Sequence, residues 1–348
     1  MPPDPHNILN LQTDDHKSSV PNAVGADPPS PHRIVQIVAV VTCLTALLPI
    51  TIGSFVTTLK AGMAFADWPT SDGHNMLLYP WLKDLRHTDK FVEHGHRLAG
   101  VLIGLVSIGL VCVCLRLEKR PWVRRFSWLI LVAVIGQGLL GGMRVRLNAQ
   151  TLAMLHSITG GLFFTLCFLF AGLVRSRPVS GDSNADVRIS VMTFAAGVLL
   201  PVIVFGQYIL GGCVRHLGTM LHEHLAGAAI VSLITGAVLV SVLRSPCSGL
   251  RGAGRRVLAA LLFQVSLGLG AWVTKLGFPP MGWVAVMNSP QQNIICSFHT
   301  VGGMLLLATS SALCLELCRS AVDGRIESLR QILDPSGTFA GIRHGGAA

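Results

Sequence analysis

The sequence predicts an all-α integral membrane protein whose eight transmembrane helices form two pseudo-symmetric four-helix bundles. Hydrophobic residues make up 51% of the 348 positions and charged residues 13%, and the mean hydropathy is +0.59. A soluble chain of this length would need a more charged surface. The apolar residues form long blocks rather than short alternating runs, which favours membrane helices over barrel strands. A two-helix pattern also repeats four times along the chain.

A hydrophobic window of about 20 residues locates the eight spans. They cover residues 34–58, 91–115, 126–143, 150–174, 189–213, 221–243, 257–275 and 292–318. Several exceed the length that a bilayer requires, so we expect tilt or extension beyond the membrane.

The loops between the spans alternate in charge and predict the orientation. Basic clusters fill residues 116–125, 175–188 and 244–256, whereas the long 59–90 loop offsets four basic residues with four aspartates. The positive-inside rule then places both termini in the cytoplasm and the 59–90 loop outside. The net charge of +10 lies mainly in short loops between apolar blocks, so we interpret it as a topology signal and expect no nucleic-acid partner.

Five segments follow from these spans. Residues 1–33 are polar and Pro-rich and contain four aspartates, unlike a signal or transit peptide, which predicts a disordered cytoplasmic N-terminus in a bacterial plasma-membrane protein. An N-terminal half at 34–175 and a C-terminal half at 189–318 are joined by a cytoplasmic linker at 176–188. Residues 319–348 are expected to form a cytoplasmic tail.

The internal repeat combines a glycine-rich helix end with a histidine at the next helix start. Related text occurs in QGLLGGMRVR at 137–146, QYILGGCVRH at 207–216 and, more weakly, QVSLGLGAWVT at 264–274. Even-numbered spans begin with a histidine followed by small residues, at His96, His156, His224 and His299. Glycines beside these histidines allow a second helix, or a flat ring, to approach the backbone closely.

The four histidines are candidate axial ligands of haem iron. A single intramembrane histidine is about as often a core residue bonded to a carbonyl, but four at equivalent positions indicate a function, because polar groups are costly in lipid. Imidazoles on facing helices suit haem iron, whereas Zn²⁺ requires three or four converging ligands. Two histidines per half therefore predict two porphyrin sites. The nine cysteines lack a CxxC or zinc pattern, and we assign them no catalytic role.

A carboxylate accompanies the first of these histidines. Glu93 and His96 are three residues apart and share a helix face, while the corresponding stretch at 221–225 has a different arrangement. A helix-start carboxylate favoured by the helix dipole is the alternative interpretation. Four arginines at the same level are candidates for pairing with haem propionates, although interfacial snorkelling explains each of them equally well. They are Arg97, Arg144, Arg146 and Arg215.

Together these motifs resemble the haem A synthase family. The resemblance rests on Glu-x-x-His-Arg at 93–97, Gly-x-x-x-x-Asp-Trp-Pro at 62–69, the Leu-Gly-Gly helix ends and the four histidines, and it covers roughly residues 35–316. It implies an oxidoreductase that acts on a CH group and converts haem O to haem A for cytochrome oxidase. A ring methyl would be oxidised stepwise to a formyl group, with water supplying the oxygen.

The resemblance also implies a role for each half. The second half would hold a haem b cofactor, an iron porphyrin, between His224 and His299. The first half would receive the substrate haem O near His96, His156 and Arg97. Glu93 would be the catalytic residue, because a carboxylate in low dielectric stabilises positive charge that develops on the methyl carbon and can orient the attacking water. Expected partners are haem O synthase, cytochrome oxidase assembly factors and membrane lipid, and the pattern is compatible with an oligomer.

Two features of the sequence depart from the family pattern. Ala66 stands where relatives often have proline, and the 59–90 loop lacks the cysteine pair of many bacterial members, which argues against a thiol-mediated electron relay. The ligand in the sixth span stays open between His224 and His222, since an ungapped comparison of the Leu-Ala-Gly text places His224 opposite Arg97.

Two other functions fit parts of the same pattern. A non-catalytic dihaem b-type cytochrome would need the four histidines equally, but has no use for Glu93 or for the difference between the halves. A transporter would explain the internal repeat, but the centres of the spans lack charged residues.

Overall fold

The computed structural model describes residues 32–175 and 189–322, which lie in a compact unit that begins at Pro31. These residues form eight long helices, and each is long and apolar enough to cross a membrane. The helices are α1 (Arg33–Thr58), α2 (Thr88–Leu117), α3 (Pro121–Leu147), α4 (Gln150–Arg175), α5 (Val191–Leu217), α6 (Leu221–Leu243), α7 (Ser248–Leu276) and α8 (Pro290–Val322). The predicted all-α fold with eight membrane helices is confirmed. The expected disordered N-terminus, the linker and most of the tail lie outside the described residues.

The observed helices begin and end beyond the predicted spans where the extra turns are charged. The α7 helix starts at Ser248 rather than at residue 257, because its first turns carry arginines that a hydropathy window rejects, although arginine is a good helix former. Local signals fix other ends. Pro121 occupies the first turn of α3, where its missing N–H costs nothing. The αL residues Asn148 and Gly218 end α3 and α5.

Each half of the chain closes a ring of four helices. In the first half α1 packs against α2 and α4, and α3 packs against α2 and α4. In the second half α5 packs against α6 and α8, and α7 packs against α6 and α8. The side chains that face away from both rings are apolar, as Leu105, Val132, Val202 and Leu233 show by exposing more than half of their surface. That surface suits a lipid environment.

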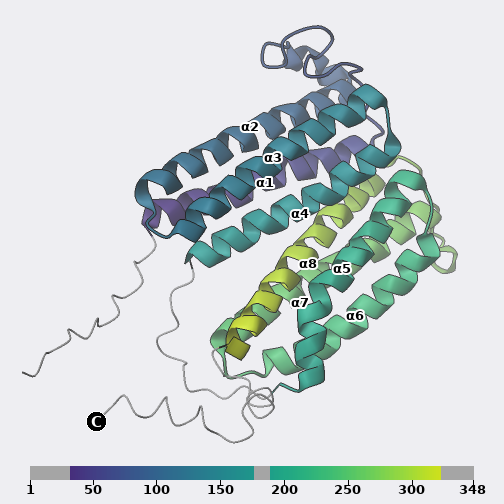
Figure 1. Cartoon of the computed structure of the whole chain (residues 1–348). Helices are drawn as coiled ribbons and strands as arrows, with labels where there is room; N and C mark the ends of the chain where they lie inside the picture. The colour runs from purple at the N-terminus through teal and green to yellow at the C-terminus, as the bar shows by residue number, and fades with distance from the viewer. Residues whose placement is uncertain (1–31, 176–188, 323–348) are drawn as a thin grey trace, which may run out of the picture. The chain divides into compact units, whose positions relative to one another are not determined.

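The α8 helix belongs to both rings. It also packs against α1 and α4, and Figure 1 shows it between α4 and the other helices of the second half. Its Val301, Met304 and Ala308 join the hydrophobic core of the first half. Its Leu307 and Leu313 join the core of the second. One helix therefore carries two apolar faces, which explains why it is buried over most of its length.

The segment between α1 and α2 forms a structured cap at one end of the first ring. It contains the 3₁₀ helix η1 (Trp81–Arg86), which packs on α2. The Trp81 ring stacks on Phe91 with centroids 4.6 Å apart, and its Nε1 donates to the Phe91 carbonyl at 2.8 Å. A second short 3₁₀ helix, η2 (Pro279–Met281), lies between α7 and α8. These contacts hold the cap over the start of α2, where the predicted site residues lie.

Candidate functional site

The four predicted histidines occupy one recurring environment. Each ring lies against a glycine of the preceding odd-numbered helix, so closely that a side-chain carbon on that glycine would lie within 3.2 Å of the histidine Cε1. The pairs are Gly53–His96, Gly141–His156, Gly211–His224 and Gly268–His299. The sequence repeat thus reappears as a repeated side-chain contact, and the glycines are needed because any larger residue would displace the ring.

The four rings face one another in two pairs. The ring centroids of His96 and His156 are 6.1 Å apart with planes at 85°, and those of His224 and His299 are 6.2 Å apart at 84°. Two imidazoles on opposite sides of one metal atom, with metal–nitrogen distances of roughly 2.0–2.1 Å, would place their centroids about 6 Å apart. Both pairs therefore fit axial ligation of a haem iron.

Hydrogen bonds orient these rings unequally. The Nδ1 of His96 donates to the carbonyl of Pro49 at 2.9 Å, which leaves its Nε2 lone pair for a ligand. The amide Nε2 of Gln207 lies 2.9 Å from Nδ1 of His224 and donates to the His224 carbonyl at 2.8 Å. Among the described residues, no hydrogen bond of normal geometry reaches the buried Nδ1 atoms of His156 and His299, although the backbone of Gln137 and that of Gln264 lie close enough to interact with these rings. Each ring is therefore oriented by the helix that precedes it.

The structure separates the two candidates in the sixth span. His224 contacts Gly211 and faces His299, as the repeat requires, whereas His222 is exposed on the first turn of α6. The neighbouring Glu223 is exposed too. This arrangement places His224 in the position that matches the other three histidines.

Glu93 is buried beside the first pair, at 2% exposure. Its Oε1 accepts from Arg97 at 3.1 Å, and its Oε2 accepts from the backbone N–H of Phe65 at 3.2 Å. A carboxylate has about four acceptor positions. These two bonds therefore orient Glu93 and leave about two acceptor positions free. The arrangement can hold a negative charge in a fixed place.

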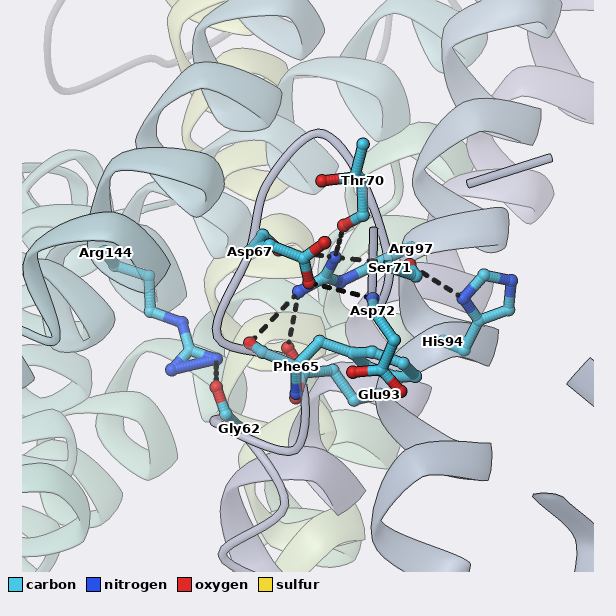
Figure 2. A network of polar contacts seen from close by, with 10 residues as sticks. All are labelled: Gly62, Phe65, Asp67, Thr70, Ser71, Asp72, Glu93, His94, Arg97 and Arg144. Atoms are coloured by element: carbon cyan, nitrogen blue, oxygen red, sulfur yellow. Dashed lines mark hydrogen bonds and ion pairs between the residues drawn. The ribbon is translucent and has the colours of Figure 1, made fainter. Parts of the chain in front are cut away.

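Arg97 is the centre of the network in Figure 2. Besides Glu93, its guanidinium donates to the carbonyls of Asp67 at 2.9 Å, Thr70 at 2.7 Å and Phe65 at 3.4 Å, and to the Ser71 hydroxyl at 3.4 Å. Its planar fork suits several acceptors at once. The described contacts therefore tie Arg97 to the cap, and the propionate role expected for it stays a prediction.

The Gly62–Pro69 motif is the segment that Arg97 holds. The Asp67 carboxylate accepts from the N–H groups of Asp72 and Gly73 at 3.0 and 2.9 Å. Burial alone would raise the pKa of Asp67, but the hydrogen bonds from Thr70, Gly73 and Asp72 together lower it below its ordinary value. The side chain of Asp67 thus closes this loop through hydrogen bonds to the backbone that follows it.

One aromatic contact and one hydrogen bond from an arginine attach the same motif to α3. The Trp68 ring occupies the space next to Gly142, where no side chain would fit. Arg144 donates to the carbonyl of Gly62, as Figure 2 shows. The cap is therefore fixed to both α2 and α3.

A cavity of about 930 Å³ lies under this cap, near the upper limit of usual ligand pockets. Its wall contains Glu93, His96, Arg97, Arg144 and His156. The structure thus brings together the residues predicted for the substrate site. Arg146, by contrast, is exposed at the end of α3. The pair formed by His224 and His299 is a separate site in the second ring.

Residues of the second half also form part of the cavity wall, which the sequence did not indicate. They include Tyr208, Arg215 and His216 of α5 and Gln292, Cys296 and Thr300 of α8. The sequence repeat does contain Arg215 and His216, but it carries no signal for packing between the halves. All nine cysteines are free thiols, and the described residues contain no cluster of three or more metal-ligating side chains.

Comparison with known proteins gives a family match and two relatives. A family model described as cytochrome oxidase assembly protein, COX15-CtaA, matches residues 36–226, more than half of the chain, and ends before α7 and His299. A "Heme A synthase" from Jannaschia sp. (strain CCS1) is 30% identical over 129 residues, 35% of this chain and 34% of that protein. A "Heme A synthase" from Symbiobacterium thermophilum is 28% identical over 198 residues, 54% of this chain and 61% of that protein.

These matches span about a third and about three-fifths of the relatives' own lengths. No solved structure matches the chain.

Proposed function

Because the chain belongs to the COX15-CtaA family of cytochrome oxidase assembly proteins, we propose that it is a haem A synthase that oxidises a ring methyl of haem O to a formyl group. The protein is a multi-pass membrane protein. We infer a bacterial plasma membrane, both termini in the cytoplasm and the cap outside. Haem O synthase and cytochrome oxidase assembly factors are the proposed partners.

The observation that carries this proposal is the difference between the two histidine pairs. The cavity beside His96 and His156 contains the buried carboxylate Glu93, whereas the carboxylate nearest in sequence to His224 is the exposed Glu223. A protein that only transfers electrons needs two equivalent ligand pairs. A fixed charge beside one pair alone suits a chemical step at that pair.

Each half then has a distinct task. His224 and His299 would hold haem b, which supplies a site for electron acceptance when bound. His96 and His156 would hold the substrate, haem O, in the cavity under the cap. Conversion of methyl and one water to formyl releases four electrons and four protons, as two successive two-electron oxidations require.

The residues of the cavity contribute position, field and proton acceptance. Removing electrons from the substrate methyl develops positive charge at that carbon, and the buried carboxylate of Glu93 would stabilise it. The two unused acceptor positions of the carboxylate can orient an incoming water and take its proton. Arg97 helps to fix the carboxylate in place, because a nitrogen of its guanidinium lies 3.1 Å from Oε1 of Glu93.

Identification of the bound porphyrins tests the proposal. The protein would be expressed in cells that also make haem O, purified in detergent, and its extracted porphyrins identified by mass. We expect haem b together with haem O, its hydroxylated form or haem A. Haem b alone, despite a supply of haem O, would indicate an electron-transfer cytochrome. A preparation without any haem would contradict both functions.

A further inference from the structure

His216 is a residue of the second half that lines the cavity of the first. It lies in the last turn of α5 and forms part of the same cavity wall as Glu93, His96 and His156. Its Nε2 is buried and has no hydrogen-bond partner among the described residues. A buried polar nitrogen without a partner costs free energy. The structure therefore leaves this nitrogen available to a bound molecule.

The preceding residue fixes the position of His216. Arg215 donates to the Thr300 hydroxyl of α8 at 2.9 Å and to the Thr58 hydroxyl of α1 at 2.8 Å. It also donates to the carbonyls of Cys296 at 3.3 Å and of Ser54. These bonds attach the end of α5 to α1 and α8. The backbone position of His216 is therefore fixed at the cavity wall.

Tyr208, two turns earlier, fixes the same helix from the other side. A side-chain carbon on Gly161 of α4 or on Gly303 of α8 would lie 2.8 or 3.1 Å from its ring. The ring therefore fills the space between these two helices. Arg215 and Tyr208 together fix the part of α5 that carries His216.

The surroundings of His216 favour an anion. Arg97, Arg144 and Arg215 line the same cavity, and Glu93, already paired with Arg97, is the acid among its described wall residues. The guanidinium groups of Arg97 and Arg215 each donate four or more hydrogen bonds to protein acceptors. Arg144, with one such bond to Gly62, and His216, with none at Nε2, have donors left to offer.

We propose that His216 is a substrate-binding residue whose Nε2–H donates a hydrogen bond to a carboxylate of the porphyrin in the first-half cavity. The inference rests on the proposed function to the extent that this ligand is a porphyrin bearing carboxylates. It adds that the second half, which holds the cofactor, also supplies part of the substrate site. The repeat supports a special role, since the equivalent residue of α3 is Arg146, which is exposed.

Two iron porphyrins separate this role from a structural one. Protein that carries its cofactor haem would be titrated with haem b, which has two propionates, and with iron etioporphyrin, which has alkyl groups only. A hydrogen bond to a charged group contributes about 1.5–3 kcal/mol, so His216→Ala should weaken binding of the carboxylate-bearing porphyrin about 10- to 100-fold. Binding of the alkyl porphyrin should not change.

Two further variants sharpen the test. His216→Gln keeps an N–H donor and should restore part of the affinity, whereas Arg146→Ala, at the equivalent repeat position, should leave both affinities unchanged. Equal losses for both porphyrins in His216→Ala, or no loss for either, would overturn the inference while leaving the proposed function intact. If the unmodified protein takes up neither porphyrin beyond its cofactor, the proposed function itself fails.

Discussion

At the scale of single residues, Glu93 combines burial with strong polar contacts. Its side chain is buried, and its two oxygens accept hydrogen bonds from the guanidinium of Arg97 and from the backbone N–H of Phe65. The position of the carboxylate is therefore set by these two partners rather than by solvent. Such preorganised charge is the kind that lowers a reaction barrier without reorganisation at the moment of reaction.

We therefore expect Glu93→Gln to lower haem A formation about 10²- to 10³-fold, because glutamine keeps the shape and can accept one of the two hydrogen bonds but removes the charge. The measurement is haem A formed per mole of haem b-loaded protein. The variant should still bind haem O, since His96 and His156 are unchanged. Glu93→Asp keeps the charge and is the control. Near-normal turnover in Glu93→Gln would show that the charge of Glu93 takes no part in the reaction.

Arg97 yields a prediction about the cap. Arg97→Lys should loosen the 59–90 segment, because an ammonium is a compact charge that cannot reach the carbonyls of Asp67 and Thr70 and the carboxylate of Glu93 together. Chymotrypsin should then cut within this aromatic-rich segment faster than in the unmodified protein. Arg146→Lys, at an exposed position, is the control. Equal cleavage rates in both variants would show that Arg97 does not hold the cap.

At the scale of helices, the contact between a glycine and a histidine is the unit that repeats. The first unit differs from the others, since Pro49 occupies the place, four residues before the glycine, that Gln137, Gln207 and Gln264 take elsewhere. The Pro49 carbonyl accepts from Nδ1 of His96. A carbonyl can only accept, so this unit fixes the tautomer of its histidine.

Gly53→Ala tests the fit between helix and ring. A side-chain carbon there would lie 2.8 Å from the His96 ring, so the ring must shift, and overpacking of this kind costs on the order of 1–3 kcal/mol. We expect haem O binding to weaken about tenfold or more in a binding titration. Gly104→Ala in α2 meets nothing within 4 Å and should have no effect. Unchanged binding in Gly53→Ala would remove His96 from the site.

The second pair gives a spectroscopic prediction. If this pair holds haem b as proposed, His224→Ala and His299→Ala should each abolish the low-spin spectrum, because each histidine would supply one of the two protein ligands of the iron. His222→Ala should leave that spectrum intact, since His222 is exposed. Loss of the spectrum in His222→Ala together with its retention in His224→Ala would reverse the assignment.

Sequence reasoning succeeded where a pattern is periodic and failed where a contact depends on packing. Hydropathy located every helix, and the repeat located the four histidines, because both signals recur along the chain. Nothing in the sequence indicates that Arg97 binds loop carbonyls. Every residue has a backbone carbonyl, so residue types do not show which carbonyls accept a hydrogen bond from a side chain. The places of Tyr208 and His216 were also unpredictable, because they depend on how α8 joins the two rings.

At the scale of the whole molecule, the orientation in the membrane decides where the substrate site opens. Reporter fusions after residue 76, within the cap, should be active on the outer side of the membrane, and fusions after residue 119 on the cytoplasmic side. The reason is the basic cluster at 116–125, which the positive-inside rule keeps in the cytoplasm. The opposite pattern would place both porphyrin sites near the cytoplasmic surface.

The position of α8 sets an order of events during synthesis. Helices emerge from the ribosome from the N-terminus onward, at about 5–20 residues per second. The first ring is therefore complete in sequence, with its histidines and Glu93 in place, before α8 exists. Yet α8 supplies Gln292, Cys296 and Thr300 to the wall of the first cavity. A nascent or truncated chain thus has an unfinished pocket, and the first cavity is completed only by the helix that also carries His299 of the second pair.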